Sequence, residues 1–418
     1  MIKVRLTDII QFNPPESIKK GTVAKKIPME KLLPHTKKIS GFENAAYSAG
    51  PKFRNEDTLL AKITPCLENG KTAFVDILNE KEVAFGSSEF IVLRAIEDIS
   101  DANYIYYLAR SPKFRNRAIS CMEGTSGRKR VNDKTLQNEE FYFPDLPTQS
   151  AIAHVLSSLD NKIELNNKIN KELESLTKTI YEYWFVQNAD ENWEKKKIGE
   201  LAEVFRGTTI TEKQTKNGNI KVVAGGVDYS YCHSEFNREK NTITISGSGA
   251  NAGYVNFWRE RIFASDCTTV RGKTDFDTIL ICQHLKRNQE NIFRSAKGSA
   301  QPHVYPSDIK DIWFYEFPQS IKKQFTPIFE AINEQIATQQ LESANLAQLR
   351  DFLLPLLMNG QITVGKTQEE TTIKPIKEFD NSDTKYEIWK TQIGLAARGD
   401  ISEQTLRNIY EAIDENDR

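Results

Sequence analysis

Two long stretches of the chain repeat hydrophobic residues at alternating steps of four and three. The first begins at Ile152 and the second at Phe325, and each position of the second lies 173 residues beyond its partner in the first. The first series is Ile152, Leu156, Leu159, Ile163, Asn166, Asn170, Leu173, Thr177, Ile180 and Trp184, and the second is Phe325, Phe329, Ile332, Ile336, Gln339, Ser343, Leu346, Arg350, Leu353 and Leu357. This heptad spacing predicts two long α-helices, over residues 147–186 and 320–358, each with a narrow apolar stripe that needs a helical partner.

Polar residues interrupt both stripes at the same places, so that Asn166 matches Gln339 and Asn170 matches Ser343. If the two helices pack antiparallel, Asn166 lies near Ser343 and Asn170 lies near Gln339, in the middle of the seam. Buried polar residues at heptad core positions weaken the packing but fix the register. We therefore predict that these four residues lock the helix register. The alternative is that they face solvent.

Each predicted helix follows a block of short strands, turns and a few helices. The blocks cover residues 1–146 and 189–318, and a Phe-Pro pair closes each of them, 174 residues apart. Strands are expected at 74–77, 90–93, 222–223, 242–245 and 253–258, and a helix at 103–110. Thr148 is the expected N-cap of the first long helix, and Gly360 is placed to end the second.

The chain is therefore predicted to be an α+β protein. Two mixed α/β domains are separated by two long antiparallel coiled-coil helices, in an internal pseudo-twofold repeat. A C-terminal tail with a short helix at 402–416 follows. The predicted divisions are 1–146, 147–188, 189–318, 319–362 and 363–418.

Composition and charge narrow the class of protein. No run of about 18 apolar residues is present, so no membrane span is expected, and the N-terminus has no signal-peptide core. The five cysteines form no CxxC or Cys/His cluster, which fits a reducing cytoplasm and predicts no metal site. The net charge is −1 for the whole chain; residues 1–146 carry +4, residues 189–318 carry +1 and residues 366–418 carry −4, and the remaining residues are net negative. This asymmetry is mild, and a solvated surface accounts for it equally well.

The antiparallel arrangement would place the two blocks at opposite ends of a rod. Two similar but non-identical domains at a fixed separation suit a bipartite, asymmetric DNA sequence. Loops at 124–130 and 297–303 occupy equivalent places in the two blocks and supply hydrogen-bonding side chains for base edges. The loop candidates are Thr125, Ser126, Arg128, Lys129, Arg130, Lys297, Ser299, Gln301 and His303, and the phosphate candidates are Lys62, Lys71, Arg206, Lys213, Lys221 and Lys273. For each lysine or arginine alone, a solvated surface position is the simpler alternative.

Signals of catalysis are missing from the sequence. Asn13-Pro14-Pro15-Glu16 lacks the aromatic residue that would stack a flipped base, so a turn is expected there. The Gly-rich stretch at 246–253 is followed by no predicted helix, and no phosphate-binding loop of the Gly-Lys-Ser/Thr type occurs. The five histidines stand at neither triad nor metal spacing. We predict a protein that is not itself an enzyme and needs no cofactor.

The second block contains a series of small-residue motifs: Gly225-Gly226, the Ser-x-Ser-Gly run beginning at Ser246, Ala252-Gly253-Tyr254-Val255 and Ala264-Ser265-Asp266. With this series the block resembles the target recognition domain of the DNA specificity subunits of type I restriction–modification systems. The approach to the first helix, through Phe143-Pro144, Pro147 and Gln149, and the end of the second, residues 353–362, resemble the conserved helical regions of that family. The first block departs from the pattern, because Ile63-Thr64-Pro65-Cys66 stands where the second has its Ser-x-Ser-Gly run.

The resemblance implies a division of labour among subunits. Each target recognition domain would read half of a split sequence in double-stranded DNA, while the helices set the spacer and dock two modification (methyltransferase) subunits. Restriction subunits, which are ATP-dependent translocases and nucleases, are a further implied partner. The implied DNA-contacting set adds Thr64, Asn69, Gly225, Gly226, Ser246, Ser248 and Asn251. The alternative function is a coiled-coil scaffold that binds no specific DNA, and steep salt dependence of DNA binding distinguishes the two.

Overall fold

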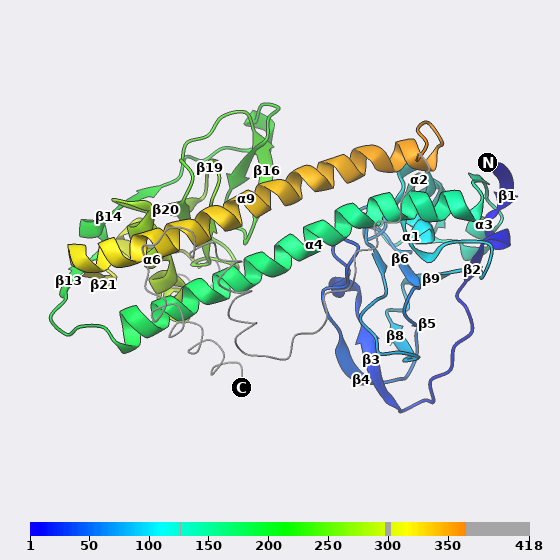
Figure 1. Cartoon of the computed structure of the whole chain (residues 1–418), viewed down its shortest axis with the longest axis horizontal. Helices are drawn as coiled ribbons and strands as arrows, with labels where there is room; N and C mark the ends of the chain where they lie inside the picture. The colour runs from blue at the N-terminus through cyan, green and yellow to red at the C-terminus, as the bar shows by residue number, and fades with distance from the viewer. Residues whose placement is uncertain (126, 297–301, 365–418) are drawn as a thin grey trace. The chain divides into compact units, whose positions relative to one another are not determined.

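The computed structural model describes residues 1–125, 127–296 and 302–364 (Figure 1). These residues form two compact units. Unit 1 comprises residues 1–166 and 342–364, and unit 2 comprises residues 167–341. The expected tail helix at 402–416 lies outside the described residues, as do Ser126, Lys297, Ser299 and Gln301.

Unit 1 is built on two four-stranded sheets and a two-stranded ribbon. In the first sheet every neighbouring pair is antiparallel, whereas β3 and β8 of the second are parallel. The first sheet has the order β2 (Ile10–Phe12), β9 (Phe90–Ala95), β6 (Thr58–Ala61) and β7 (Thr72–Phe74), and the second β4 (Glu43–Ala46), β3 (Val23–Ile27), β8 (Ala84–Gly86) and β5 (Lys52–Phe53). The ribbon pairs β1 (Ile2–Arg5) with β12 (Glu140–Phe143), and a second short pair joins β10 (Met122–Glu123) to β11 (Arg130–Val131). The helices of the unit, apart from the long ones, are α1 (Ala102–Arg110), α2 (Pro112–Ser120) and α3 (Asp133–Gln137), with the 3-10 turns η1 (Leu6–Asp8) and η2 (Met29–Lys31).

Unit 2 repeats this topology. Its main sheet has the order β14 (Ala202–Arg206), β20 (Cys267–Gly272), β17 (Thr242–Ser246) and β18 (Val255–Trp258), and its smaller sheet β16 (Tyr229–His233), β15 (Ile220–Val223) and β19 (Ile262–Ala264), with β15 parallel to β19. The ribbon pairs β13 (Glu194–Lys197) with β21 (Trp313–Glu316), and the other elements are α5 (Ile198–Leu201), α6 (Asp275–Arg287), α7 (Gln289–Ser295), α8 (Pro306–Lys310) and η4 (Glu212–Gln214). The main sheets of the two units have the same strand order, with β14, β20, β17 and β18 in the places of β2, β9, β6 and β7, and α6 takes the place of α1. The predicted internal repeat is therefore confirmed.

Aromatic side chains fill the core of each unit. In unit 1, the helix expected at 103–110 is present as α1, because Asp101 caps it by accepting a hydrogen bond from the backbone N–H of Tyr104. Tyr106 and Tyr107 of α1 are fully buried. In unit 2, Phe185 packs edge-on against Phe325, with ring centroids 5.1 Å apart. This contact joins the two long helical segments within unit 2.

Two long helices, α4 (Leu146–Glu182) and α9 (Gln319–Met358), each contribute residues to both units. A π-helical turn, η3 (Tyr183–Gln187), extends α4. The prediction that Thr148 caps α4 was wrong. Asp145 is the cap, because its carboxylate accepts a hydrogen bond from the Thr148 N–H at 3.1 Å. At the other end of α9, Gly360 has a φ of +67°, and its N–H donates to the Leu357 carbonyl at 3.1 Å, as expected of a helix-ending glycine.

The contacts between the long helices establish that they run antiparallel within unit 1. Asn166 of α4 donates its side-chain amide to the Ser343 hydroxyl of α9 at 3.3 Å, and Arg350, later in α9, pairs with Asp160, earlier in α4. Rising numbers along one helix therefore meet falling numbers along the other. Among the helices that the structure describes, none is long and apolar enough to cross a membrane.

Candidate nucleic-acid interface

Close backbone approaches bring several loops of unit 2 together where the main sheet meets the smaller one. A Cβ on Gly225, in the turn after β15, would lie 2.9 Å from the carbonyl oxygen of Ser248, in the loop after β17. The Ser246 hydroxyl donates to the Gly226 carbonyl at 2.8 Å and ties the same two loops together. A side chain at position 225 would force the two loops apart, which explains the glycine there.

Asp266 lies at the centre of these loops. The Ser248 hydroxyl donates to its carboxylate, and a guanidinium nitrogen of Arg206 lies 3.6 Å from the other carboxylate oxygen. The Arg206 side chain remains 64% exposed. An ion pair this open is weak in water, so Arg206 is free to exchange Asp266 for a phosphate or a base edge.

The segment after the undescribed residues 297–301 borders the same loops. His303 forms an isolated antiparallel bridge with Ser248, and the Val304 N–H donates to the Gly247 carbonyl at 3.1 Å. The His303 ring stacks on Tyr305, with centroids 6.1 Å apart and an interplanar angle of 21°. Asn251 is exposed in the adjoining loop. Unit 2 thus gathers Arg206, Gly225, Gly226, Ser246, Ser248, Asn251 and His303 from distant parts of the sequence.

Unit 1 builds the corresponding arrangement from different side chains. Ile63 forms an isolated antiparallel bridge with Arg130, and the Thr64 N–H donates to the Lys129 carbonyl at 3.0 Å. This pairing sets the loop between β10 and β11 beside the segment after β6, as His303 is set beside Ser248 in unit 2. Arg128, Lys129 and Thr125 are exposed on that loop, and Asn69 is exposed nearby.

Some of the predicted phosphate contacts already have protein partners. Arg130 holds both carboxylate oxygens of Glu89, at distances down to 2.7 Å, and this hydrogen bonding lowers the pKa of Glu89. The Lys71 ammonium donates to the Met29 carbonyl at 3.1 Å, and Lys221 pairs with Glu260 at 2.6 Å. Each of these three cations would have to leave its protein partner to contact DNA, and DNA contact by them stays a prediction.

Lys62 and Thr64, two further candidates for DNA contact, are only half-buried and contact neighbouring residues. Lys62 is half-buried and contributes its backbone carbonyl to the Val131 N–H at 2.9 Å. Thr64 is half-buried, and its hydroxyl donates to Glu68 at 3.3 Å. DNA contact by each of these residues stays a prediction.

Sequence reasoning missed exposed apolar residues beside the Gly-Gly pair. Val227, in the turn between β15 and β16, is 49% exposed, and Tyr229, the first residue of β16, is 43% exposed. The Val227 carbonyl accepts a hydrogen bond from the Asn256 side chain at 3.2 Å, which fixes the turn that displays them. Two exposed apolar side chains on a fixed turn suit contact with thymine methyl groups. The only signal available in the sequence was their position within three residues of two glycines.

Burial shifts the pKa values of two ionisable groups of unit 2. Burial raises the pKa of the Cys267 thiol to about 12, so it stays protonated at neutral pH. Burial also lowers the pKa of His284, in the core of unit 2, to about 4. In the described residues no group of three His, Cys, Asp or Glu side chains could hold a metal ion.

Comparison with known proteins places the chain in a family. The profile of the type I restriction modification DNA specificity domain matches it twice, over residues 3–175 and 190–348. The chain belongs to this family of type I restriction–modification specificity subunits. The two matches fall on the two halves of the internal repeat.

Individual relatives agree with this assignment. The MjaIX specificity subunit of Methanocaldococcus jannaschii is 24% identical over 305 residues, which cover 63% of this chain and 69% of that protein. The EcoAI specificity subunit of Escherichia coli is 32% identical over 149 residues, covering 34% of this chain and 25% of that protein. The crystal structure of the specificity subunit from Mycoplasma genitalium has a TM-score of 0.55, with 16% identity and coverage of 85% of this chain and 95% of that one. At this identity the structural match establishes the fold alone.

Proposed function

We propose that this chain is the sequence-reading subunit of a type I restriction–modification complex, and that each unit reads one half of a bipartite, asymmetric site in double-stranded DNA. The observation that carries the proposal is the repeated juxtaposition of two loops. Ile63 is bridged to Arg130 in unit 1, and Ser248 is bridged to His303 in unit 2. The same backbone arrangement presents different side chains, so the two halves of the site should differ in sequence.

The exposed side chains divide by the kind of contact they can make. Arg128, Lys129 and Arg206 carry charge on open loops and suit phosphate or guanine contacts. Ser248, Asn251 and His303 offer short polar groups that suit base edges. The Gly-Gly turn lets the loop that carries Ser248 pack closely against the turn after β15, which holds these side chains in place. Phosphate contacts would set affinity, and the second group would set specificity.

The long helices supply the spacer and the docking surface in this proposal. Each helix runs unbroken through residues of both units, so the number of helical turns would set the separation of the two half-sites. Leu349 and Phe352 of α9 are 45% and 65% exposed and form an apolar surface fit for a modification subunit. The chain itself would carry no methyltransferase, ATPase or nuclease chemistry; the modification subunits, and restriction subunits where they join, would supply it in the cytoplasm.

Exchange of one unit tests the proposal. Residues 190–318 would be replaced by the corresponding block of another specificity subunit, and the chimera assembled with modification subunits in cells. Single-molecule sequencing would then report the methylated motif. We expect one half of the motif to change, while the other half and the spacer stay the same. A change in both halves, or in neither, would refute the assignment of one half-site to each unit.

A further inference from the structure

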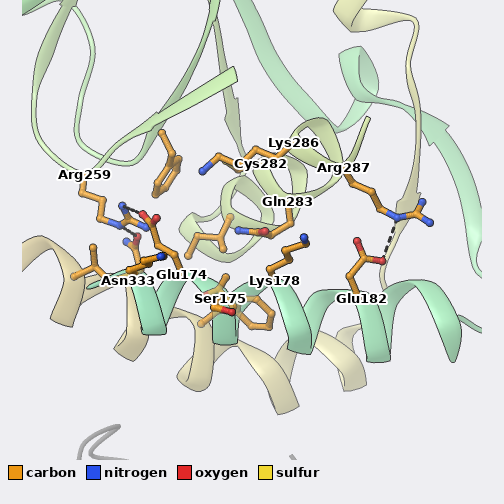
Figure 2. Close-up of a pocket in the computed structure, with 16 residues that line it drawn as sticks. Glu174, Ser175, Lys178, Glu182, Arg259, Cys282, Gln283, Lys286, Arg287 and Asn333 are labelled. Atoms are coloured by element: carbon orange, nitrogen blue, oxygen red, sulfur yellow. Dashed lines mark hydrogen bonds and ion pairs between the residues drawn. The ribbon is translucent and has the colours of Figure 1, made fainter. Parts of the chain in front are cut away.

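A cleft of about 570 Å³ opens on unit 2 between α4, α6, α9 and the edge strand β18 (Figure 2). Its floor is apolar, with Phe257, Ile279, Phe329 and Ile336 among the lining residues. Its rim is polar and carries lysines and arginines from both α4 and α6. A cavity of this size, with an apolar floor and a charged rim, suits a few side chains of a peptide.

The cleft has more positive than negative charge. Five basic and two acidic side chains line it, a net of +3. Both carboxylates already have partners, as the dashed lines of Figure 2 show: Glu174 lies 3.2 Å from Arg259, and Glu182 lies 3.1 Å from Arg287. Three cations remain. Within the described part of the chain, no acidic side chain forms an ion pair with Lys171, Lys178 or Lys286, and all three are exposed.

In unit 1 an ion pair spans the place that corresponds to Gln283 and Lys178. Arg110 of α1 pairs with Asp351 of α9 at 2.7 Å. At the 173-residue spacing, these positions correspond to Gln283 of α6 and Lys178 of α4, so unit 2 has replaced an ion pair by a neutral residue and an unpaired cation. Figure 2 shows Lys178 and Gln283 on facing walls of the cleft.

A lysine of unit 1 links α1 and α4, which correspond to α6 and α9, two of the helices that line the cleft. The Lys37 ammonium donates to Asn103 at 2.8 Å and to Ser157 at 3.3 Å, and it lies over the rings of Tyr106 and Tyr107. Unit 1 thus ties these elements together with its own side chains. Unit 2 has a cleft lined with cations between the corresponding elements, as expected of a site that takes an acidic segment from elsewhere.

We propose that the cleft binds an acidic peptide segment, and that its occupant is residues 409–417 of this chain. That segment contains Glu411, Asp414, Glu415 and Asp417 and no lysine or arginine. Its apolar residues, Tyr410 and Ile413 among them, would meet the floor, while its carboxylates meet Lys171, Lys178 and Lys286. The net charge of −4 on the segment complements the net of +3 on the cleft.

Chain length and tethering favour this occupant over a free peptide. Residues 365–408 precede the segment and, fully extended, would reach roughly 145 Å, whereas a helix as long as α9 spans about 60 Å. Attachment to the same chain raises the effective concentration of the segment to the order of millimolar. A weak electrostatic contact is then sufficient for occupancy. The apolar floor also distinguishes the cleft from a phosphate-binding surface, which needs exposed cations that follow the duplex.

Site-specific crosslinking tests the contact directly. Benzoylphenylalanine would replace Gln283 in the full chain, with the exposed helix residue Gln340 as the control position. After illumination and digestion, mass spectrometry should find crosslinks from position 283 to peptides within 402–418 and none from position 340. An absence of tail crosslinks from position 283, or crosslinks from 283 only to an added modification subunit, would overturn the proposal.

Charge reversal tests the recognition. The variant K171E/K178E/K286E should speed amide hydrogen exchange across residues 409–417 by about tenfold or more, because an undocked segment loses protection. The matched control K19E/K20E/K81E makes the same charge change on exposed lysines of unit 1 and should leave that exchange unchanged. Adding E411K/D414K/E415K to the first variant should restore protection. Melting curves of both triple variants establish that each is folded.

The alternatives give distinct outcomes. If the cleft binds DNA, the K171E/K178E/K286E variant lowers DNA affinity while exchange at 409–417 stays at the wild-type rate. That result overturns the proposal, as does equal exchange in the two triple variants. Failure of the compensating tail substitutions to restore protection also refutes direct charge recognition.

Discussion

Replacement of two polar residues in the helix seam of unit 2 should stabilise the protein. Asn170 of α4 is 8% exposed, and Gln339 of α9 is half-buried. The side-chain carbonyl oxygens of both are buried, and neither has a hydrogen-bond partner among the described residues. The predicted perturbation is the double variant N170L/Q339L, which removes both oxygens and completes the heptad stripe.

The magnitude follows from the cost of unpaired polar groups. A buried acceptor without a partner costs about 1–3 kcal/mol, and water that reaches the seam offsets part of this cost. We expect a net gain of about 2 kcal/mol for the pair. For a unit the size of residues 167–341, each kcal/mol shifts the melting temperature by roughly 2–4 °C. The predicted increase is therefore about 4–8 °C.

Differential scanning calorimetry of the full chain would measure the shift. The control N167L/Q340L adds the same two leucines at neighbouring exposed positions and should change the melting temperature little. The prediction applies to the transition of unit 2. A decrease in that transition for N170L/Q339L, with the control unchanged, would show that the two polar residues make favourable interactions and would refute the reasoning.

Three further predictions concern the buried pair, the pH response and the reading loops. Replacing Arg350 by Met should destabilise unit 1 by about 3–5 kcal/mol in denaturant unfolding, because it strands the buried carboxylate of Asp160; a loss below 1 kcal/mol would contradict burial of the pair. His284 has a pKa of about 4 in the folded protein against 6.5 in the unfolded chain, so the unfolded chain binds a proton first as the pH falls. The free energy of unfolding is therefore unaffected by this group above pH 6.5 and decreases as the pH falls toward 4, by about 2 kcal/mol at pH 5. The H284Q variant should show a correspondingly shallower loss of melting temperature between pH 7 and 5, and an unchanged slope would refute the assignment. Replacing Gly225 by Val should abolish reading of one half-site and leave the other intact, since a Cβ there meets the Ser248 carbonyl at 2.9 Å, and equal loss at both half-sites in methylation assays would contradict this.

The repeat and the long helices could be predicted from the sequence because they depend on periodic local signals. The heptad series located α4 and α9 to within about one residue at their starts, and Gly360 marked the end of α9. The strand expected at 74–77 ends instead at Phe74. Opposite it, Glu56 has a φ of +72° and interrupts regular pairing, and a non-glycine residue gives little warning of that conformation.

The interface and the cleft depend on contacts that no local pattern encodes. From the sequence alone, Lys71 and Lys221 are candidates for phosphate contacts. In the fold Lys71 donates a hydrogen bond to the Met29 carbonyl, and Lys221 pairs with Glu260. The sequence does not indicate that Lys178 lacks an acidic partner. In the fold its unit 1 counterpart, Asp351, pairs with Arg110, and comparison with this pair identifies Lys178 as unpaired among the described residues. Long-range pairing of this kind is set by tertiary structure, so composition and spacing alone could not reveal it.

A binding matrix would test most directly the claim that each loop pair reads its own half-site. Two variants, R128A/K129A in unit 1 and R206A/S248A in unit 2, would be assembled with modification subunits and titrated against DNA carrying the intact site or either half scrambled. Each variant should lose about tenfold to hundredfold of its discrimination at one half-site only, a different half for each. If both variants weaken discrimination at the same half-site, or at both equally, the two units do not read separate halves.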